Sequence, residues 1–360
     1  DPGAFGFTPW IDLDLGIGGV FAVKDRVRRV FDRLTGIMDR VRDVARSPLV
    51  AGTDESFTLH HDGRTRRYLL HVPAHDANSA GLPLVLVLHG GGGNGEIAAQ
   101  STGFAAVADR EGFAVAFPDG TGKLPRRLLT WNDGVLPVYA VDREVDDVGF
   151  LREVVTDVAR RVPIDAGRVF AVGHSNGGMM CHRLARDAAD LFAGIAVVSG
   201  AMNYTAKDSA AAIGVVLVHG TADEHVPYLG GKPTQATGRA GEREDTSVQA
   251  AVDYYLARNG LLGYPDSSTD PQRPGVRVDT YGKDKLGEAS WTPVRVITLE
   301  GGGHAWPSTD GKAPRRLLAD RPFPFDASQA IWDFFTLVRR DGGVTARPGK
   351  TKGSPPAVPR

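Results

Sequence analysis

The pattern of apolar and polar positions divides the chain into a long central part and two different ends. From about Phe57 onward, short continuous apolar runs such as LVLVL at 84–88 alternate with longer stretches in which apolar residues recur at helical spacing. Continuous apolar runs are typical of strands buried on both faces of a sheet. Strands that alternate with helices indicate a mostly parallel sheet with helices on both faces. The pattern therefore predicts an α/β domain over residues 51–340, led by an antiparallel pair at 56–61 and 65–73. The runs expected to be buried strands are 82–90, 113–120, 168–173, 193–200, 213–220 and 294–301.

The first fifty residues and the last twenty do not follow this alternation. After a turn-rich start, residues 20–48 place valine, leucine and isoleucine at helical spacing opposite a face rich in arginine. This spacing predicts an amphipathic helix within an N-terminal extension, residues 1–50. Such a helix can pack on the main domain, act as a lid or dimer contact, or lie on a membrane surface. Residues 341–360 contain glycine, proline, lysine and arginine without apolar periodicity, which predicts a disordered tail or a linker.

Net charge, cysteine content and the length of the apolar runs argue against several classes of protein. The net charge is −1 at pH 7, so no basic field indicates nucleic-acid binding. The single cysteine, Cys181, excludes an intrachain disulfide and is expected to be a buried thiol. No apolar run approaches the roughly 20 residues of a membrane span, so we expect no integral membrane segment. Because the chain begins with Asp1 rather than methionine, we expect that it has been processed or cut. We expect the protein to be secreted or at the cell surface, with the cytoplasm as the alternative. The oligomeric state stays open, a monomer included.

A serine stands at a sharp break between an apolar run and a helical stretch. Gly173, His174, Ser175, Asn176 and Gly177 fit the pattern G-x-S-x-G, after an expected strand and before an expected helix. The glycines suit a strained turn whose neighbours crowd the backbone. The start of the helix also places partial positive charge beside the serine hydroxyl. The pattern indicates either a tight turn that needs small residues or a nucleophile, Ser175, presented to a substrate.

A nucleophilic serine needs a base and an acid, and two later residues stand where both are needed. Asp223 and His304 each follow an apolar run directly, and His304 lies in a glycine-rich loop. The carboxyl ends of parallel strands converge on one edge, where open α/β sheets bind ligands. The order serine, acid, histidine is also that of the nucleophile-elbow fold. We therefore expect a triad of Ser175, Asp223 and His304, with Glu224 as the alternative acid.

The tetrahedral intermediate of such a reaction needs two N–H donors. One is expected from Asn176, the residue after the nucleophile, and the other from the glycine-rich loop at 88–96. A phosphate cradle is the alternative for this loop, but the loop lacks the G-K-[ST] ending of a P-loop.

The remaining acidic and histidine residues do not have the spacing of a metal site. The histidines lack H-E-x-x-H spacing, and Asp119 and the acids at 142–147 lack EF-hand spacing. No metal or other cofactor is expected. Asp146 and Asp147 are expected to cap a helix, with a supporting role in the site as the alternative.

Several short motifs resemble one family of enzymes. The stretches LHGGGGN, AFPDG, TWNDG, VDDVGFL, GHSNGGMM, HGTADEHVPY and GGGHAWPS are similar to those of the polyhydroxybutyrate-depolymerase-like esterases. These are related to the feruloyl and acetyl-xylan esterases of carbohydrate esterase family one. The resemblance spans roughly residues 55–338 and implies an α/β-hydrolase fold. The chain departs from the family in having no cysteine pair and in its long polar loop at 229–245.

The resemblance also implies roles for individual residues. They are the nucleophile Ser175, the acid Asp223, the base His304, the oxyanion-hole donors Gly91 and Asn176, and two tryptophans near the acyl or alcohol pocket, Trp131 and Trp306.

The expected reaction is hydrolysis of a carboxylic ester through an acyl-enzyme. The expected substrate is an ester, small or polymeric, of the polyhydroxyalkanoate or hydroxycinnamoyl (feruloyl) type. Acetyl-xylan, short-chain and aromatic polyester hydrolysis are alternatives, as are a peptidase or acyltransferase with the same triad and a catalytically silent binding protein. Trp131, Tyr228 and Trp306 are expected to bind the substrate, with the packing of loops as the alternative role.

Overall fold

The computed structural model describes residues 7–12, 17–22, 52–74, 81–203, 211–235, 241–269, 273–282, 292–309 and 321–340. The chain divides into two units, one of residues 1–51 and 74–79 and the other of residues 52–73 and 80–360. In the first unit, β1 (Phe7–Asp12) pairs antiparallel with β2 (Ile17–Ala22). Residues 20–22, where the helix expected over 20–48 would start, belong to strand β2. The rest of that expected helix lies outside the described residues, as does the tail expected at 341–360.

The second unit is built on a sheet of ten strands in the order β10-β11-β12-β9-β8-β7-β5-β6-β4-β3. The strands from β12 to β6 in this order run parallel, and an antiparallel pair extends the sheet at each edge. This confirms the mostly parallel sheet and the leading antiparallel pair that the sequence predicts. The strands are β3 (Thr53–His61), β4 (Arg64–Val72), β5 (Leu82–Leu88), β6 (Ala114–Pro118), β7 (Ile164–His174), β8 (Gly194–Val198), β9 (Gly214–Gly220), β10 (Asp266–Thr269), β11 (Val276–Tyr281) and β12 (Val294–Leu299).

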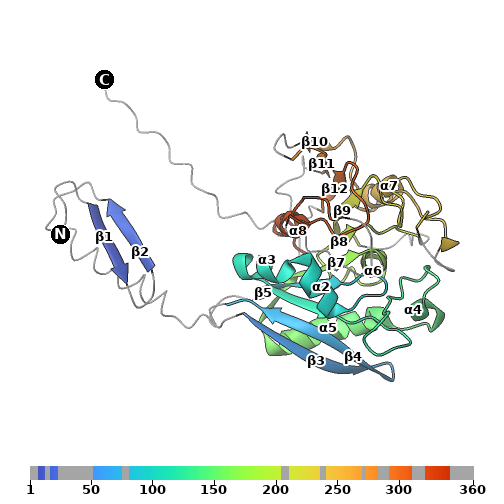
Figure 1. The fold of residues 1–360 in the computed structure, drawn as a ribbon, viewed down its shortest axis with the longest axis horizontal. Coiled ribbons are helices and arrows are strands. Elements are labelled where there is room, and N and C mark those ends of the chain that lie inside the picture. Colours follow the sequence, from blue (N-terminus) through green and yellow to red (C-terminus); the bar gives the residue numbers. More distant parts are fainter. Residues whose placement is uncertain are drawn as a thin grey trace. The chain divides into compact units, whose positions relative to one another are not determined.

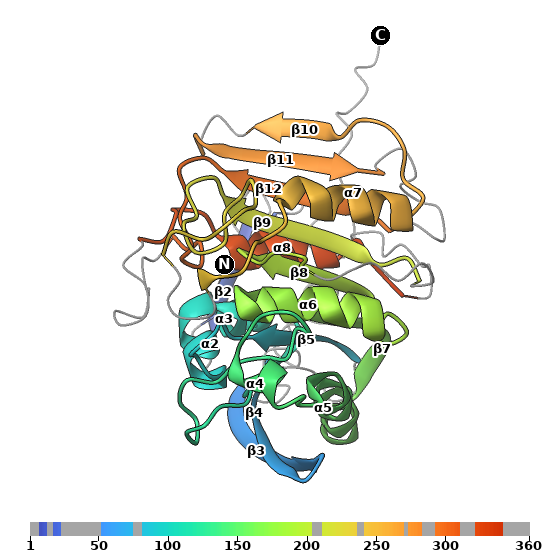
Figure 2. The same cartoon turned by 90° about the vertical axis from the view of Figure 1, so that its right-hand side faces the viewer.

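Helices cover both faces of this sheet (Figure 1). Figure 2 shows α6 and α7 in front of the sheet and α8 behind it. Strand β5 shows why two layers form: its leucines enter the core on the side of α5 and α6, whereas Val85 and Val87 enter the core on the side of α3 and α8. Side chains of a strand alternate between the two faces, so a continuous apolar run needs cover on both. The helices are α2 (Gly95–Thr102), α3 (Phe104–Glu111), α4 (Tyr139–Asp142), α5 (Asp147–Arg161), α6 (Asn176–Asp187), α7 (Val248–Arg258) and α8 (Ala327–Phe335).

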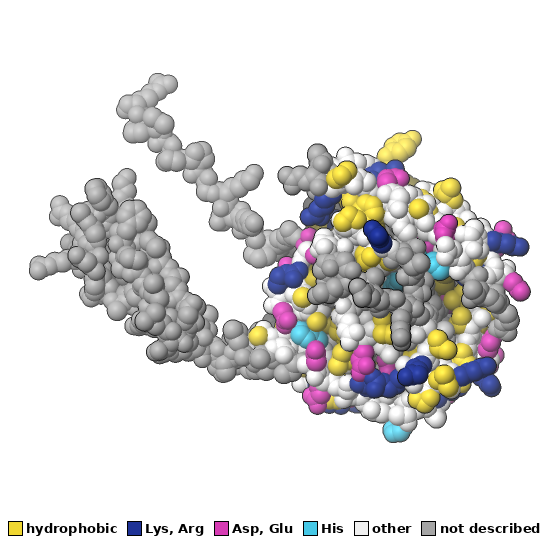
Figure 3. Space-filling view, in the orientation of Figure 1, with side chains coloured by type: hydrophobic (Ala, Val, Ile, Leu, Met, Phe, Trp, Pro, Cys, Tyr) yellow, Lys and Arg dark blue, Asp and Glu magenta, His cyan; other side chains and the backbone are white. Residues whose placement is uncertain are grey.

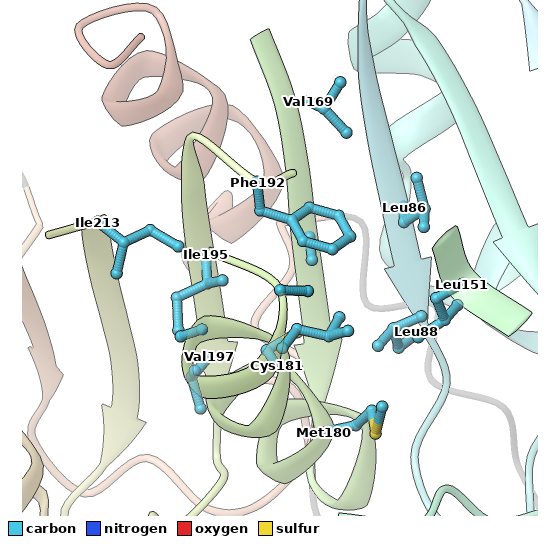
Figure 4. Close-up of a cluster of buried hydrophobic side chains, with 14 of the residues drawn as sticks. Leu86, Leu88, Leu151, Val169, Met180, Cys181, Phe192, Ile195, Val197 and Ile213 are labelled. Atoms are coloured by element: carbon cyan, nitrogen blue, oxygen red, sulfur yellow. The ribbon is translucent and has the colours of Figure 1, made fainter. Parts of the chain in front are cut away.

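Helix α6 is anchored by a closely packed aliphatic cluster. Figure 4 shows Met180 and Cys181 of this helix among aliphatic side chains of β5, β7 and β8. Cys181 is fully buried, which confirms the expected buried thiol. Each fully buried valine, leucine, isoleucine or methionine side chain of this cluster stabilises the fold by roughly 1.5–3 kcal/mol. The helix that follows the serine is therefore held firmly against the centre of the sheet.

The strand order changes direction between β5 and β7. From β5 the chain adds β6 on one side, and from β7 it adds β8, β9 and β12 on the other. Loops at the carboxyl ends of strands diverge at such a switch point, which makes room for a ligand. The glycine-rich loop follows β5 and the serine follows β7, so the two predicted parts of the site lie on either side of this point.

The surface of the described residues carries both charges. On the face in Figure 3, basic and acidic side chains are interspersed, in keeping with a net charge of −1. None of the helices in the described part of the chain has the length and apolar character needed to cross a membrane.

Candidate active site

Ser175 occupies a strained turn between β7 and α6. Its backbone has φ 54° and ψ −122°, a region that non-glycine residues rarely adopt. Such strain costs about 1–3 kcal/mol and persists only where the surroundings enforce it. The flanking glycines are required: a Cβ on Gly173 would lie 2.1 Å from the carbonyl oxygen of Gly177, and a Cβ on Gly177 would lie 2.5 Å from that of Leu88. The turn thus depends on the residue types of the motif.

His304 and Asp223 meet at the same edge of the sheet. The imidazole Nδ1 of His304 lies 2.8 Å from Asp223 Oδ2, and both residues are buried. The other oxygen, Asp223 Oδ1, accepts hydrogen bonds of 2.9 Å from the amides of His225 and Val226. His219 Nε2 lies 3.4 Å from Asp223 Oδ2 and donates to the Val226 carbonyl at 2.8 Å. Both carboxylate oxygens of Asp223 therefore have partners, and Oδ2 is the oxygen that contacts His304.

The electrostatics favour an ionised Asp223. Burial raises the pKa of this carboxyl, but the hydrogen bonds and charges of His219 and His304 outweigh it and hold the pKa well below its usual range. The alternative acid, Glu224, is exposed and its side chain bonds to Gln235 at 2.5 Å. The structure thus brings Asp223, rather than Glu224, against the histidine.

The residue before the serine touches the histidine from a second direction. His174 Nε2 donates a 2.7 Å hydrogen bond to the backbone carbonyl of His304, and the two rings lie 5.0 Å apart. Burial lowers the pKa of His174 to about 4, so its ring is neutral near pH 7. His174 therefore connects the serine turn directly to the loop that carries His304.

The glycine-rich loop after β5 lies against the serine turn. A Cβ on Gly90 would lie 3.5 Å from the Cβ of Ser175, and a Cβ on Gly91 would lie 3.7 Å from the Cβ of Asn176. Two backbone segments, separated by more than eighty residues in the sequence, are thus in van der Waals range at the serine.

Two amides at this contact have no acceptor within the described residues. The amides of Gly92 and Gly93 donate to backbone carbonyls at 2.7 and 3.0 Å, whereas those of Gly91 and Asn176 make no hydrogen bond there. Asn176 is the first residue of α6, where backbone N–H groups lack helical partners and the helix dipole favours negative charge. The two predicted oxyanion-hole donors are therefore available side by side.

The side chain of Asn176 makes hydrogen bonds to a neighbouring loop that the sequence pattern does not predict. Its Oδ1 accepts a 2.7 Å hydrogen bond from the Trp131 amide, and its Nδ2 donates to the Trp131 carbonyl and to Asp133 Oδ2, both at 3.2 Å. The side chain thereby pairs with both backbone groups of one residue, as a neighbouring strand would. It fastens the TWND segment to the first turn of α6.

A buried ion pair holds the same segment from the other side. Asp147 Oδ2 accepts from the Asn132 amide at 2.7 Å, while its Oδ1 pairs with Arg66 at 2.7 Å. Arg183 donates to the Asn132 carbonyl at 2.6 Å. Asp146, not Asp147, caps α5 by accepting from the Gly149 amide. The position of Asp147 thus matches the supporting role that was the alternative for this residue.

Comparison with known proteins identifies the family. The family described as Esterase PHB depolymerase matches residues 66–230. NocK of Nocardia uniformis subsp. tsuyamanensis, assigned as an esterase, is 31% identical over 277 residues, which cover 75% of this chain and 79% of NocK. The chain belongs to the polyhydroxybutyrate-depolymerase-like esterase family. It is a carboxylic ester hydrolase, as the sequence motifs predict.

Two further comparisons concern more distant proteins. Feruloyl esterase B of Piromyces equi is 27% identical over 259 residues, which cover 69% of this chain and 44% of that protein. The crystal structure of native sOPH superposes with a TM-score of 0.52 at 18% identity, covering 83% of this chain and 93% of that one. A likeness at this identity concerns the fold alone. The predicted α/β-hydrolase fold is confirmed.

The aromatic residues predicted to bind substrate lie mostly inside the esterase. Trp131 is fully buried, and its Nε1 donates a 2.9 Å hydrogen bond to the His89 carbonyl. This position fits the packing role kept as the alternative. Trp306 is buried with its ring against that of His174, and the half-buried Tyr228 bonds through its hydroxyl to Thr298 at 3.1 Å. Substrate contact by these two residues stays a prediction.

Asp119 is one of the acidic residues that lack EF-hand spacing in the sequence. Asp119 Oδ1 accepts a 2.7 Å hydrogen bond from the Gly95 amide at the start of α2. Among the described residues, no group of three or more His, Cys, Asp or Glu side chains could hold a metal ion.

Proposed function

We propose that the esterase acts through an acyl-enzyme formed on Ser175. In this mechanism His304 Nε2 takes the proton of the Ser175 hydroxyl as the oxygen attacks the ester carbonyl. Asp223 holds the proton of the imidazole on Nδ1 and stabilises the cation that forms. The observation that carries the proposal is the 2.8 Å contact between His304 Nδ1 and Asp223 Oδ2 beside a strained serine turn.

The negative oxygen of the tetrahedral intermediate is assigned to the amides of Gly91 and Asn176. Both N–H groups lack acceptors within the described residues, and a Cβ built on Gly91 would lie 3.7 Å from the Cβ of Asn176, the residue that follows Ser175. His304 then protonates the leaving alcohol, and water repeats the cycle on the acyl group. Loss of one such donor typically costs about 10² to 10³ in rate.

The decisive experiment uses Ser175→Ala and a p-nitrophenyl ester. We expect the variant to lose turnover and to lose covalent labelling by a fluorophosphonate probe, which the unaltered esterase should show on Ser175. Normal turnover of the variant would refute the mechanism. Labelling of the unaltered chain at another residue, with none on Ser175, would likewise contradict the assignment of the nucleophile.

We further propose polyhydroxyalkanoate-type or hydroxycinnamoyl esters as substrates. Membership in the family and the match to feruloyl esterase B support this choice. Turnover of methyl ferulate, hydroxybutyrate oligomers and short p-nitrophenyl esters should be compared at equal enzyme concentration. A kcat/KM for the short esters far above both other classes would contradict the proposal and favour a general short-chain esterase.

A further inference from the structure

A buried histidine lies between the strand β5 and the proposed oxyanion hole. His89 is the first residue after β5 and is 2% exposed. Its Nε2 lies 2.9 Å from the amide nitrogen of Gly120, and its Nδ1 lies 2.8 Å from the carbonyl oxygen of Gly90. An amide only donates and a carbonyl only accepts, so the ring must be neutral with its proton on Nδ1. Burial agrees with this state, because it lowers the pKa of His89 to about 4.

The carbonyl that His89 binds belongs to the same peptide unit as the Gly91 amide. In a trans peptide the C=O of one residue and the N–H of the next lie in one plane and point in opposite directions. The Gly90 carbonyl also accepts a 3.0 Å hydrogen bond from the Gly93 amide. Two hydrogen bonds therefore fix the plane on one side, and the Gly91 N–H is directed to the other.

The preceding peptide unit is fixed as well. The carbonyl of His89 accepts the 2.9 Å hydrogen bond from Trp131 Nε1, and the ring centroids of His89 and Trp131 lie 5.0 Å apart. Glycine has a wide range of backbone conformations, so a run of glycines does not hold an amide in one direction by itself. The imidazole and the indole supply that restraint from outside the glycine run.

We propose that His89 is a positioning residue of the oxyanion hole, which directs the Gly91 amide by holding the Gly90 carbonyl. This inference rests on the proposed function, in which the Gly91 and Asn176 amides stabilise the intermediate. Donors that are fixed in advance act on the transition state more than on the bound ester. Removal of the Nδ1 donor should therefore lower kcat and leave KM nearly unchanged.

Two matched variants separate the two hydrogen bonds of His89. In His89→Gln, the longer amide side chain can accept from Gly120 but no longer donates from the Nδ1 position. In His89→Asn, the amide nitrogen replaces Nδ1 as donor to Gly90, and the acceptor for Gly120 is lost. We expect His89→Gln to lower kcat by about 10- to 10²-fold, part of the loss for a missing donor, with KM within about twofold. His89→Asn should keep a kcat several-fold higher than His89→Gln, even though its melting temperature is lower.

Binding of a trifluoromethyl ketone supplies a readout that a purely structural role would not change. The serine adduct of this ketone carries an oxyanion, so its affinity should fall in His89→Gln by the same factor as kcat. The inference is overturned if His89→Gln keeps normal kcat, if the ketone binds it normally, or if kcat follows melting temperature across both variants. Ser175→Ala distinguishes this failure from a failure of the proposed function: an inactive Ser175→Ala with an unimpaired His89→Gln refutes the role of His89 alone.

Discussion

Replacement of Arg66 by methionine tests how strongly the buried ion pair supports the site. The side chains of Arg66 and Asp147 are 3% and 0% exposed, and their contact is 2.7 Å. Removing one partner of such a pair leaves a buried charge without compensation, which typically costs about 3–5 kcal/mol. Methionine can keep the apolar contact with the Phe150 ring, which lies 3.8 Å from the guanidinium carbon. We therefore expect Arg66→Met to lower the free energy of unfolding by about 3–5 kcal/mol.

A double variant makes this magnitude specific to the charge. In Arg66→Met with Asp147→Asn, no charge remains, and the asparagine oxygen can still accept from the Asn132 amide. Arg66 Nε and Nη1 have no hydrogen-bond partner among the described residues, so the native pair is incompletely satisfied. Replacing a buried ion pair by well-packed uncharged side chains of similar volume often changes the free energy of unfolding little. The double variant should thus be more stable than Arg66→Met alone, as measured by urea unfolding at pH 7.

The pH dependence of stability tests independently whether the loss in Arg66→Met comes from the unpaired charge of Asp147. Burial raises the pKa of Asp147, and the charge of Arg66 opposes that shift. Without Arg66, the folded-state pKa rises further above the unfolded value. Stability from a group of this kind is present at pH below its unfolded pKa and is lost as pH rises through the folded pKa. The deficit of Arg66→Met should therefore be larger at pH 8 than at pH 5. A deficit below about 1 kcal/mol, additive losses in the double variant, or a deficit that grows on acidification would refute the reasoning.

Two further variants address the site directly. Asp223→Asn should lower kcat by about 10³- to 10⁴-fold, because the amide no longer fixes the imidazole proton on Nδ1; a loss of less than tenfold in steady-state p-nitrophenyl ester hydrolysis would contradict this role. Trp131→Phe removes the 2.9 Å hydrogen bond to the His89 carbonyl and should lower kcat at nearly constant KM; a raised KM with unchanged kcat would instead indicate that the ring contacts substrate.

The elements that could be predicted are those whose signal is local. Strands such as β5 and β9 are continuous apolar runs because both faces are covered, and the serine turn needs its glycines for steric reasons within five residues. The edge strand β10 and its neighbour β11 are absent from the strands that the sequence pattern predicts. β10 is exposed along its whole length, and β11 is only partly buried, so neither has a continuous apolar run.

The supporting contacts of the site have no comparable local signal. Asn176 and Trp131 are 45 residues apart, and Arg66 and Asp147 are 81 residues apart. Whether a histidine or an aspartate binds backbone or solvent depends on which loops meet around it in the fold. Position in the G-x-S-x-G pattern indicated the amide of Asn176 but gave no reason to expect its side chain to bind the TWND segment.

Around the serine turn, the backbone after β5 must approach closely, and its amides must also keep a fixed direction. The backbone after β5 must come within van der Waals range of the serine turn, which favours glycine, yet glycine leaves an amide free to turn. Because glycines carry no side chains, the restraint has to come from neighbouring residues. The imidazole of His89, the indole of Trp131 and the amide of Asn176 each bind backbone carbonyl or N–H groups in this region. These three side chains therefore supply the restraint that the glycines themselves lack.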